Sequence, residues 1–168
     1  MQLGRNEDLE KMILDECLLT DGPYTISSGE KVDSFLDIFR SLLSIRGRML
    51  MAHDVFSAMS SQKWDNVDFV AGRETCGALL AFSLDWNKTL IVRKTSDKVE
   101  SSTDDRGTCL LVDDVTSAGV SMKDSVLKLQ KANYDVVGAL SLVYRGRGAV
   151  EVAKELVIPF HWLVYYPE

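Results

Sequence analysis

Apolar residues recur at two different spacings along this chain, and the spacings separate expected helices from expected strands. Apolar residues three or four positions apart predict helices over residues 6–19, 45–60, 75–85, 121–132 and 150–156. Short apolar runs predict strands over residues 24–26, 35–38, 67–71, 89–92, 109–112, 135–143 and 157–166. From residue 67 onward the two kinds of element alternate with short loops. This α/β pattern indicates a mainly parallel twisted sheet with helices on both faces.

The composition fits a single domain over residues 1–168. Hydrophobic residues make up 46% of the chain, which is enough for a buried core. The net charge of −6 argues against a nucleic-acid partner, and no apolar stretch is long enough to cross a membrane. The three cysteines lack metal-site spacing and the charged N-terminus has no signal-peptide core. We therefore expect a cytoplasmic protein with reduced thiols.

The most informative stretch is TCLLVDDVTSAGVSMKD, residues 108–124, in which a buried strand ends in two acids. Small and hydroxyl residues follow, and then a helix begins. Free backbone N–H groups and the positive dipole end make a helix start suitable for a phosphate. Asp113 and Asp114 would repel that phosphate, so they make sense beside it only if they hold sugar hydroxyls or a divalent cation. Phosphoribosyl pyrophosphate fits because it combines a phosphate, sugar hydroxyls and a bound divalent cation. An ordinary buried strand followed by exposed loop acids stays open as an alternative.

Other charged residues also follow predicted strands. They meet at one edge, because the carboxyl ends of parallel strands lie together and ligands bind beyond them. The charged residues expected at this edge are Arg73, Arg93, Lys94, Asp113, Asp114 and Arg145.

The segment LLVDDVTSAGVS resembles the phosphoribosyl-pyrophosphate motif of type I phosphoribosyltransferases. The segment YTISSGEKVDSFLDIF is similar to the N-terminal hood of the orotate phosphoribosyltransferases, which here spans about residues 1–40. The similarity runs from Tyr24 to Tyr144 or beyond. It implies Mg²⁺-dependent transfer of the 5-phosphoribosyl group from phosphoribosyl pyrophosphate to orotate, releasing pyrophosphate. The family usually dimerises, so we expect a homodimer.

The resemblance also assigns roles to individual residues. Asp113 and Asp114 would hold the ribose hydroxyls. Arg73 and Lys94 would take the pyrophosphate, and Arg145 the carboxylate of the base. The residues expected to cradle the 5-phosphate are Ser117, Ala118, Gly119 and Ser121. The Mg²⁺ would bridge donor oxygens and keep several waters, so few protein ligands are expected.

The chain departs from the family pattern in the loop RKTSDKVESSTDDRG, residues 93–107. The family form RKxxKxHG closes over the active site, usually that of the neighbouring subunit. Arg93 and Lys94 match this form, but Asp97 stands at the second Lys position and Val99 at the His position. Lys98 is the nearest replacement and becomes the candidate catalytic lysine, acting with Arg93, Lys94 and the metal through charge neutralisation. The loop would be a flexible lid, or else a plain linker without substrate contact.

Two further positions differ from the family. Ser27 stands where the hood usually carries a lysine, with Lys31 as the nearest replacement, and Tyr144 replaces an aspartate before Arg145. These differences leave three alternatives open: a weak or inactive regulatory protein that binds the donor, an enzyme for another base, and a receiver-type signalling domain. A receiver domain also pairs adjacent acids with Mg²⁺, but it needs a phosphoacceptor Asp at the end of a later strand and a Lys beyond that. Here the acids come too late in the chain for this order.

Overall fold

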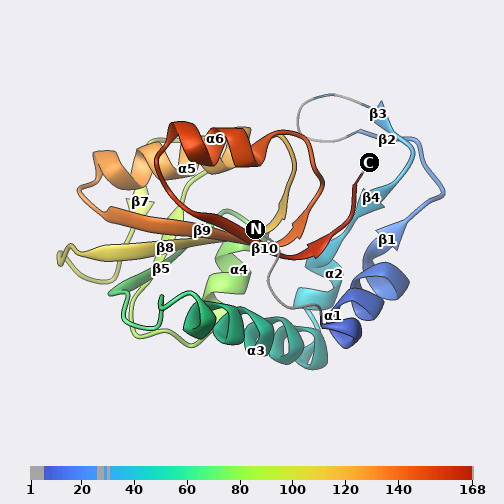
Figure 1. Cartoon of the computed structure of the whole chain (residues 1–168), viewed down its shortest axis with the longest axis horizontal. Helices are drawn as coiled ribbons and strands as arrows, with labels where there is room; N and C mark the ends of the chain where they lie inside the picture. Colours follow the sequence, from blue (N-terminus) through green and yellow to red (C-terminus); the bar gives the residue numbers. More distant parts are fainter. Residues whose placement is uncertain (1–5, 26–28, 30, 168) are drawn as a thin grey trace.

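A mainly parallel sheet forms the centre of the protein, as seen in a computed structural model that describes residues 6–25, 29 and 31–167 (Figure 1). The described residues form a six-stranded sheet in the order β10-β9-β8-β5-β6-β7. The strands are β5 (Phe69–Arg73), β6 (Thr89–Val92), β7 (Val99–Glu100), β8 (Thr108–Thr116), β9 (Asp135–Tyr144) and β10 (Phe160–Tyr165). The first and last pairs differ in direction: β10 runs parallel to β9, whereas β7 is antiparallel to β6. The predicted α/β architecture is confirmed.

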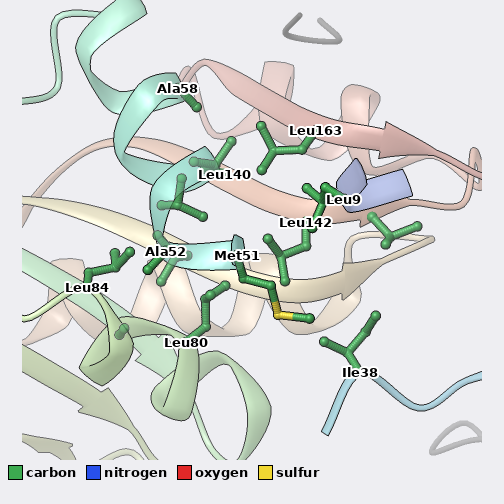
Figure 2. Close-up of a cluster of buried hydrophobic side chains, with 14 of the residues drawn as sticks. Leu9, Ile38, Met51, Ala52, Ala58, Leu80, Leu84, Leu140, Leu142 and Leu163 are labelled. Carbon is green, nitrogen blue, oxygen red and sulfur yellow. The ribbon is translucent and has the colours of Figure 1, made fainter. Parts of the chain in front are cut away.

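Helices cover both faces of this sheet (Figure 1). On one face lie α3 (Ile45–Ser61) and α4 (Cys76–Ser83), and on the other lie α5 (Val120–Lys131) and α6 (Ala149–Glu155). Successive side chains of a strand point to opposite faces. In β8, Leu110 and Val112 therefore join the core beneath α3 and α4, whereas Cys109 and Leu111 join the core beneath α5. Figure 2 shows the first of these cores, where side chains of α3, α4, β9 and β10 meet.

The N-terminal part forms a small hood beside the sheet (Figure 1). Asn6 caps α1 (Glu7–Met12) by accepting hydrogen bonds from Asp8 and Leu9 N–H, as its sequence position predicts. A π-helical turn, η1 (Ile13–Cys17), follows. The remaining hood elements are β1 (Leu18–Leu19), β2 (Tyr24–Thr25), β3 (Lys31–Val32), β4 (Phe35–Leu36) and α2 (Ile38–Leu42).

Two predicted elements of the hood are too long. The expected helix over residues 6–19 ends at Cys17, because Leu18 is extended and pairs with Leu36 of β4. The expected strand over residues 35–38 stops at Leu36, and Ile38 already begins α2. Ser27 lies outside the described residues.

The expected strand over residues 109–112 is too short. β8 continues through both acids to Thr116, because β9 keeps pairing with it at Asp113↔Ser141 and Thr116↔Tyr144. The acids are therefore part of a strand rather than of a loop. Among the described residues, none of the helices combines the length and apolar character that crossing a membrane requires.

Candidate active site

A cavity of about 400 Å³ opens where strands β5 and β8 end, beneath the hood. The predicted site residues that line it are Arg73, Lys94, Asp113, Asp114, Ser117, Ser121 and Arg145. The cavity thus collects side chains from four separate strand ends and the start of α5, as expected for the carboxyl edge of a parallel sheet. The hood contributes Thr25, Phe35 and Leu36 to the wall.

The acidic pair forms a half-buried negative centre in this cavity. The Asp113 Oδ1 atom accepts a hydrogen bond of 3.1 Å from the Asp114 backbone N–H. Burial and the neighbouring Asp114 carboxylate raise the pKa of Asp113 well above its ordinary value, and burial also raises the pKa of Asp114. Because the charged pair is unfavourable in the free protein, it is suited to a ligand that brings hydroxyl donors or a cation.

The start of α4 comes very close to these acids. A Cβ atom on Gly77 would lie 2.9 Å from Asp113 Oδ1 and 3.1 Å from the Val112 carbonyl oxygen, so this approach requires a glycine. The neighbouring Cys76 thiol is hydrogen-bonded to Asp114, and burial together with the Asp114 charge raises the pKa of the thiol to about 12. Cys76 therefore stays protonated and donates to the carboxylate.

The predicted phosphate loop runs from β8 into α5. Gly119 has a φ of 81° and precedes the first residue of the helix. A Cβ atom there would lie 2.9 Å from Ala149 Cα, so the loop packs tightly against α6. Ala118 is exposed, and neither it nor Gly119 lines the cavity. The roles of these two residues stay predictions, since a phosphate would meet them through backbone N–H groups.

Arg73 is held against α5. Its Nη1 atom donates to Asp124 Oδ2 at 2.5 Å and to Ser125 Oγ at 3.2 Å. Asp124 was not among the predicted site residues, although its position one turn after Ser121 on the predicted helix places it close to the phosphate loop.

Arg93 and Lys94 take different positions. The Arg93 guanidinium donates to Glu74 at 2.9 Å and to Glu100 at 3.2 Å, and Arg93 is not part of the cavity wall. Lys94 does line the cavity, and its backbone N–H donates to the second Glu74 oxygen at 3.1 Å. This hydrogen bond, with the Arg93 charge, lowers the pKa of Glu74. Glu74 thus joins the ends of β5 and β6.

The candidate catalytic lysine, Lys98, is not brought to the cavity. Arg93 N–H donates to the Lys98 carbonyl oxygen at 3.1 Å, and Val99 already belongs to β7 at the sheet edge. The Lys98 ammonium forms an ion pair of 2.8 Å with Glu100. Residues 93–100 therefore form a hairpin in which β7 pairs with the open edge of β6, and the role of this loop as a lid stays a prediction.

Arg145 lies between the cavity and the hood. It is buried, with an exposed fraction of 6%, and its Nη2 atom donates to Ser34 Oγ at 3.5 Å. The guanidinium carbon lies 5.5 Å from the centre of the Tyr166 ring. Tyr144, which replaces the family aspartate, packs against Trp162 with ring centres 4.6 Å apart and does not line the cavity.

The fold and this arrangement define the class. A parallel sheet with an acidic strand end, a glycine-containing loop leading into a helix, and a hood over basic residues are the features of a type I phosphoribosyltransferase. No protein-family model matches the chain.

Comparisons with known proteins carry the assignment further. The orotate phosphoribosyltransferase of Pyrococcus horikoshii is 30% identical over 172 residues, covering 96% of this chain and 91% of that protein. The crystal structure of orotate phosphoribosyltransferase from Aeropyrum pernix has a TM-score of 0.79 at 26% identity, covering 94% of this chain and 93% of that one. The Mycobacterium tuberculosis orotate phosphoribosyltransferase in complex with phosphoribosyl pyrophosphate has a TM-score of 0.73 at 22% identity, covering 94% of both chains. The chain belongs to the orotate phosphoribosyltransferase family.

Proposed function

We propose that this protein transfers the 5-phosphoribosyl group from phosphoribosyl pyrophosphate to orotate, forming orotidine 5'-phosphate and pyrophosphate. The observation that carries the proposal is the composition of the cavity wall. One space of about 400 Å³ is lined by an acidic pair, the start of a helix and three cationic side chains, Arg73, Lys94 and Arg145. Phosphoribosyl pyrophosphate has a phosphate at one end, a pyrophosphate at the other and two ribose hydroxyls between them. The helix start and the cationic side chains suit the two anionic ends, and the acidic pair suits the hydroxyls.

Each part of the donor has a counterpart in the wall. The 5-phosphate lies at the start of α5 beside Ser117 and Ser121, where N–H groups point outward. The ribose hydroxyls donate to Asp113 and Asp114, and burial raises the pKa of both acids, so added donors stabilise their charged forms. The pyrophosphate lies toward Arg73 and the Lys94 ammonium, at the ends of β5 and β6.

Mg²⁺ belongs to the same proposal. Among the described residues, no group of three or more His, Cys, Asp or Glu side chains gathers closely enough to hold a metal ion without help from a ligand. The donor set nevertheless fits, because the half-buried Asp113 and Asp114 carboxylates supply negative charge beside the expected pyrophosphate. Bound there with the donor, Mg²⁺ would neutralise charge that develops on the leaving pyrophosphate.

The acceptor base is expected on the hood side. Arg145 is a cation that contacts the hood, and it suits the carboxylate of orotate. The apolar side chains of Phe35 and Leu36 line the same cavity and offer a surface for a planar base.

A homodimer is also part of the proposal. Leu43, Ile45 and Met49, at or near the start of α3, are large apolar side chains with exposed fractions of 62%, 71% and 68%. Ile45 and Met49 line the same surface depression, and exposed apolar side chains that lie together are typical of an interface between proteins. Light scattering measures the mass directly. A monomer at assay concentrations contradicts this part.

A second candidate function is donor binding without turnover. It is favoured by the loop sequence, in which Asp97 and Val99 stand at the second Lys position and the His position of the family form. A protein of this kind would sense the donor and keep the rest of the site.

One assay separates these functions. Purified protein is mixed with Mg²⁺, phosphoribosyl pyrophosphate and a panel of bases, and pyrophosphate release is measured. Pyrophosphate release with orotate and with no other base supports the proposal. Release with a different base keeps the transferase activity but replaces orotate as the acceptor. A donor-dependent rise in melting temperature without any release supports the second candidate. If neither pyrophosphate release nor donor-dependent stabilisation is observed, both candidate functions are refuted.

Arginine variants test the acceptor end. We expect Arg145→Ala to raise the KM for orotate while donor-dependent stabilisation stays intact. Arg147→Ala removes a neighbouring, exposed arginine outside the cavity wall and serves as the matched control. Equal effects of the two substitutions contradict the placement of the base.

A further inference from the structure

Asp124 occupies a central place in a network of charges behind the cavity. Its Oδ2 atom accepts hydrogen bonds from Arg73 Nη1 at 2.5 Å and from Lys128 Nζ at 2.9 Å. Arg73 comes from the end of β5, 51 positions away in the chain, whereas Lys128 lies one turn further along α5. Asp124 itself does not line the cavity. It therefore contacts a cavity residue without facing the ligand space.

Lys128 keeps this carboxylate in place. Its side chain has an exposed fraction of only 9%, and its Nζ atom also donates to the Arg93 carbonyl oxygen at 3.0 Å. A buried ammonium needs such partners, because an unpaired buried charge is strongly unfavourable. The network consequently ties α5 to the ends of both β5 and β6.

Arg73 retains donors for a ligand. Its side chain has an exposed fraction of 14% and lines the cavity. Within the described part of the chain, its guanidinium contacts α5 through Nη1, which meets Asp124, Ser125 and the Ser121 carbonyl. A guanidinium has five N–H donors in a rigid fork, so fixing one terminal nitrogen orients the others.

We propose that Asp124 is a positioning residue that orients Arg73 toward the pyrophosphate of the donor. The proposal rests on the function proposed above and adds a residue that touches no substrate. Burial of Asp124 acts to raise its pKa, but the hydrogen bonds from Arg73 and Lys128 outweigh burial and lower it. Asp124 thus remains a carboxylate around neutral pH. The opposite role, in which Asp124 withholds Arg73 from the ligand, predicts the opposite sign in the test below.

The test compares the two halves of the donor on the intact protein. Asp124→Asn removes the charge but keeps an acceptor of the same size. We expect the Kd for inorganic pyrophosphate with Mg²⁺, measured by calorimetry, to rise roughly tenfold. The Kd for ribose 5-phosphate, which contacts the acidic pair and the α5 loop, should stay unchanged. A purely structural effect would weaken both ligands.

Three further variants complete the design. Ser125→Ala removes a milder contact to Arg73 and should weaken pyrophosphate binding in the same direction. In an Arg73→Ala background, Asp124→Asn should add nothing, because its effect passes through Arg73. Glu155→Gln breaks an exposed ion pair of 2.8 Å with Lys123 of α5 and is the matched control.

The outcomes separate the two proposals. Unchanged or tighter pyrophosphate binding in both Asp124→Asn and Ser125→Ala overturns the positioning role. If the wild-type protein binds neither pyrophosphate nor ribose 5-phosphate, the proposed function fails instead.

Discussion

Replacing Asp113 by asparagine should make the free protein more stable while abolishing donor binding. The acid is half-buried beside Asp114, and burial and repulsion between the two carboxylates raise its pKa. The introduced amide would keep an oxygen that can accept the 3.1 Å hydrogen bond from the Asp114 backbone N–H. The substitution therefore removes the unfavourable charge and leaves the local geometry intact.

The magnitude follows from the cost of holding this charge. A rise of one unit in a pKa costs the charged folded state about 1.4 kcal/mol, and partial exposure screens part of that cost. We expect Asp113→Asn to stabilise the free protein by about 1 kcal/mol, which is in the range of common stabilising substitutions. For a protein of 168 residues, this corresponds to a rise of about 2–4 °C in Tm.

The stability gain of Asp113→Asn should depend on pH in a definite direction. Since the pKa of Asp113 is raised above its ordinary value of 3.8, the folded state binds more protons than the unfolded state at intermediate pH. The contribution of this group is fully favourable below its ordinary pKa and is lost as the pH rises through its folded pKa. An asparagine side chain does not titrate. The stability gain of the variant should therefore be absent in acid and should grow as the pH rises toward neutral.

Thermal melts across this pH range, with and without phosphoribosyl pyrophosphate and Mg²⁺, provide the assay. Asp104→Asn, at an exposed position in the loop before β8, is the control and should change neither property. A free Asp113→Asn protein that melts below the wild type at neutral pH would refute the reasoning. So would a gain that is independent of pH.

Three other predictions follow from single contacts. Asp114→Asn should abolish the donor-dependent rise in stability. For the wild type this rise reaches about 2.7 kcal/mol at a donor concentration about 100 times the Kd. An unchanged rise in the variant contradicts the placement of the ribose. Ser44→Ala removes the hydroxyl that accepts a 2.9 Å hydrogen bond from Gly47 N–H at the start of α3, and should cost about 1 kcal/mol in chemical denaturation. Its control is Ser60→Ala, on an exposed position of the same helix. Cys76 should resist alkylation by iodoacetamide at about pH 8, since its pKa is raised to about 12. Mass spectrometry detects the modification. Rapid modification of Cys76 would show that the thiol is neither buried nor held by Asp114.

The local pattern of the chain predicted much of the fold. Apolar runs such as residues 109–112 become buried strands, because alternate side chains enter the two cores. The cap at Asn6 follows from its own side chain and the next three residues. The resemblance of the chain to orotate phosphoribosyltransferases, inferred from the central motif and the hood, is confirmed by the relatives. These properties depend on residues that are close together in the chain.

The ends of elements and the partners of charged side chains depended on distant segments. β8 extends through Asp113 because β9 pairs with it, and no pattern within residues 109–116 reveals that pairing. Arg93 and Lys94 are adjacent, yet Arg93 pairs with Glu74 and Glu100 while Lys94 lines the cavity.

The sequence by itself determined the five longer strands of the sheet, the helices on its faces and the acidic strand end, because hydrophobic spacing reports which face of each element is buried. Only the tertiary structure decided that Lys98 lies at the sheet edge and that Arg73 is held by Asp124. The physical reason is that a charged side chain binds whichever opposite charge the fold brings within reach, and that partner is set by packing between segments far apart in the chain.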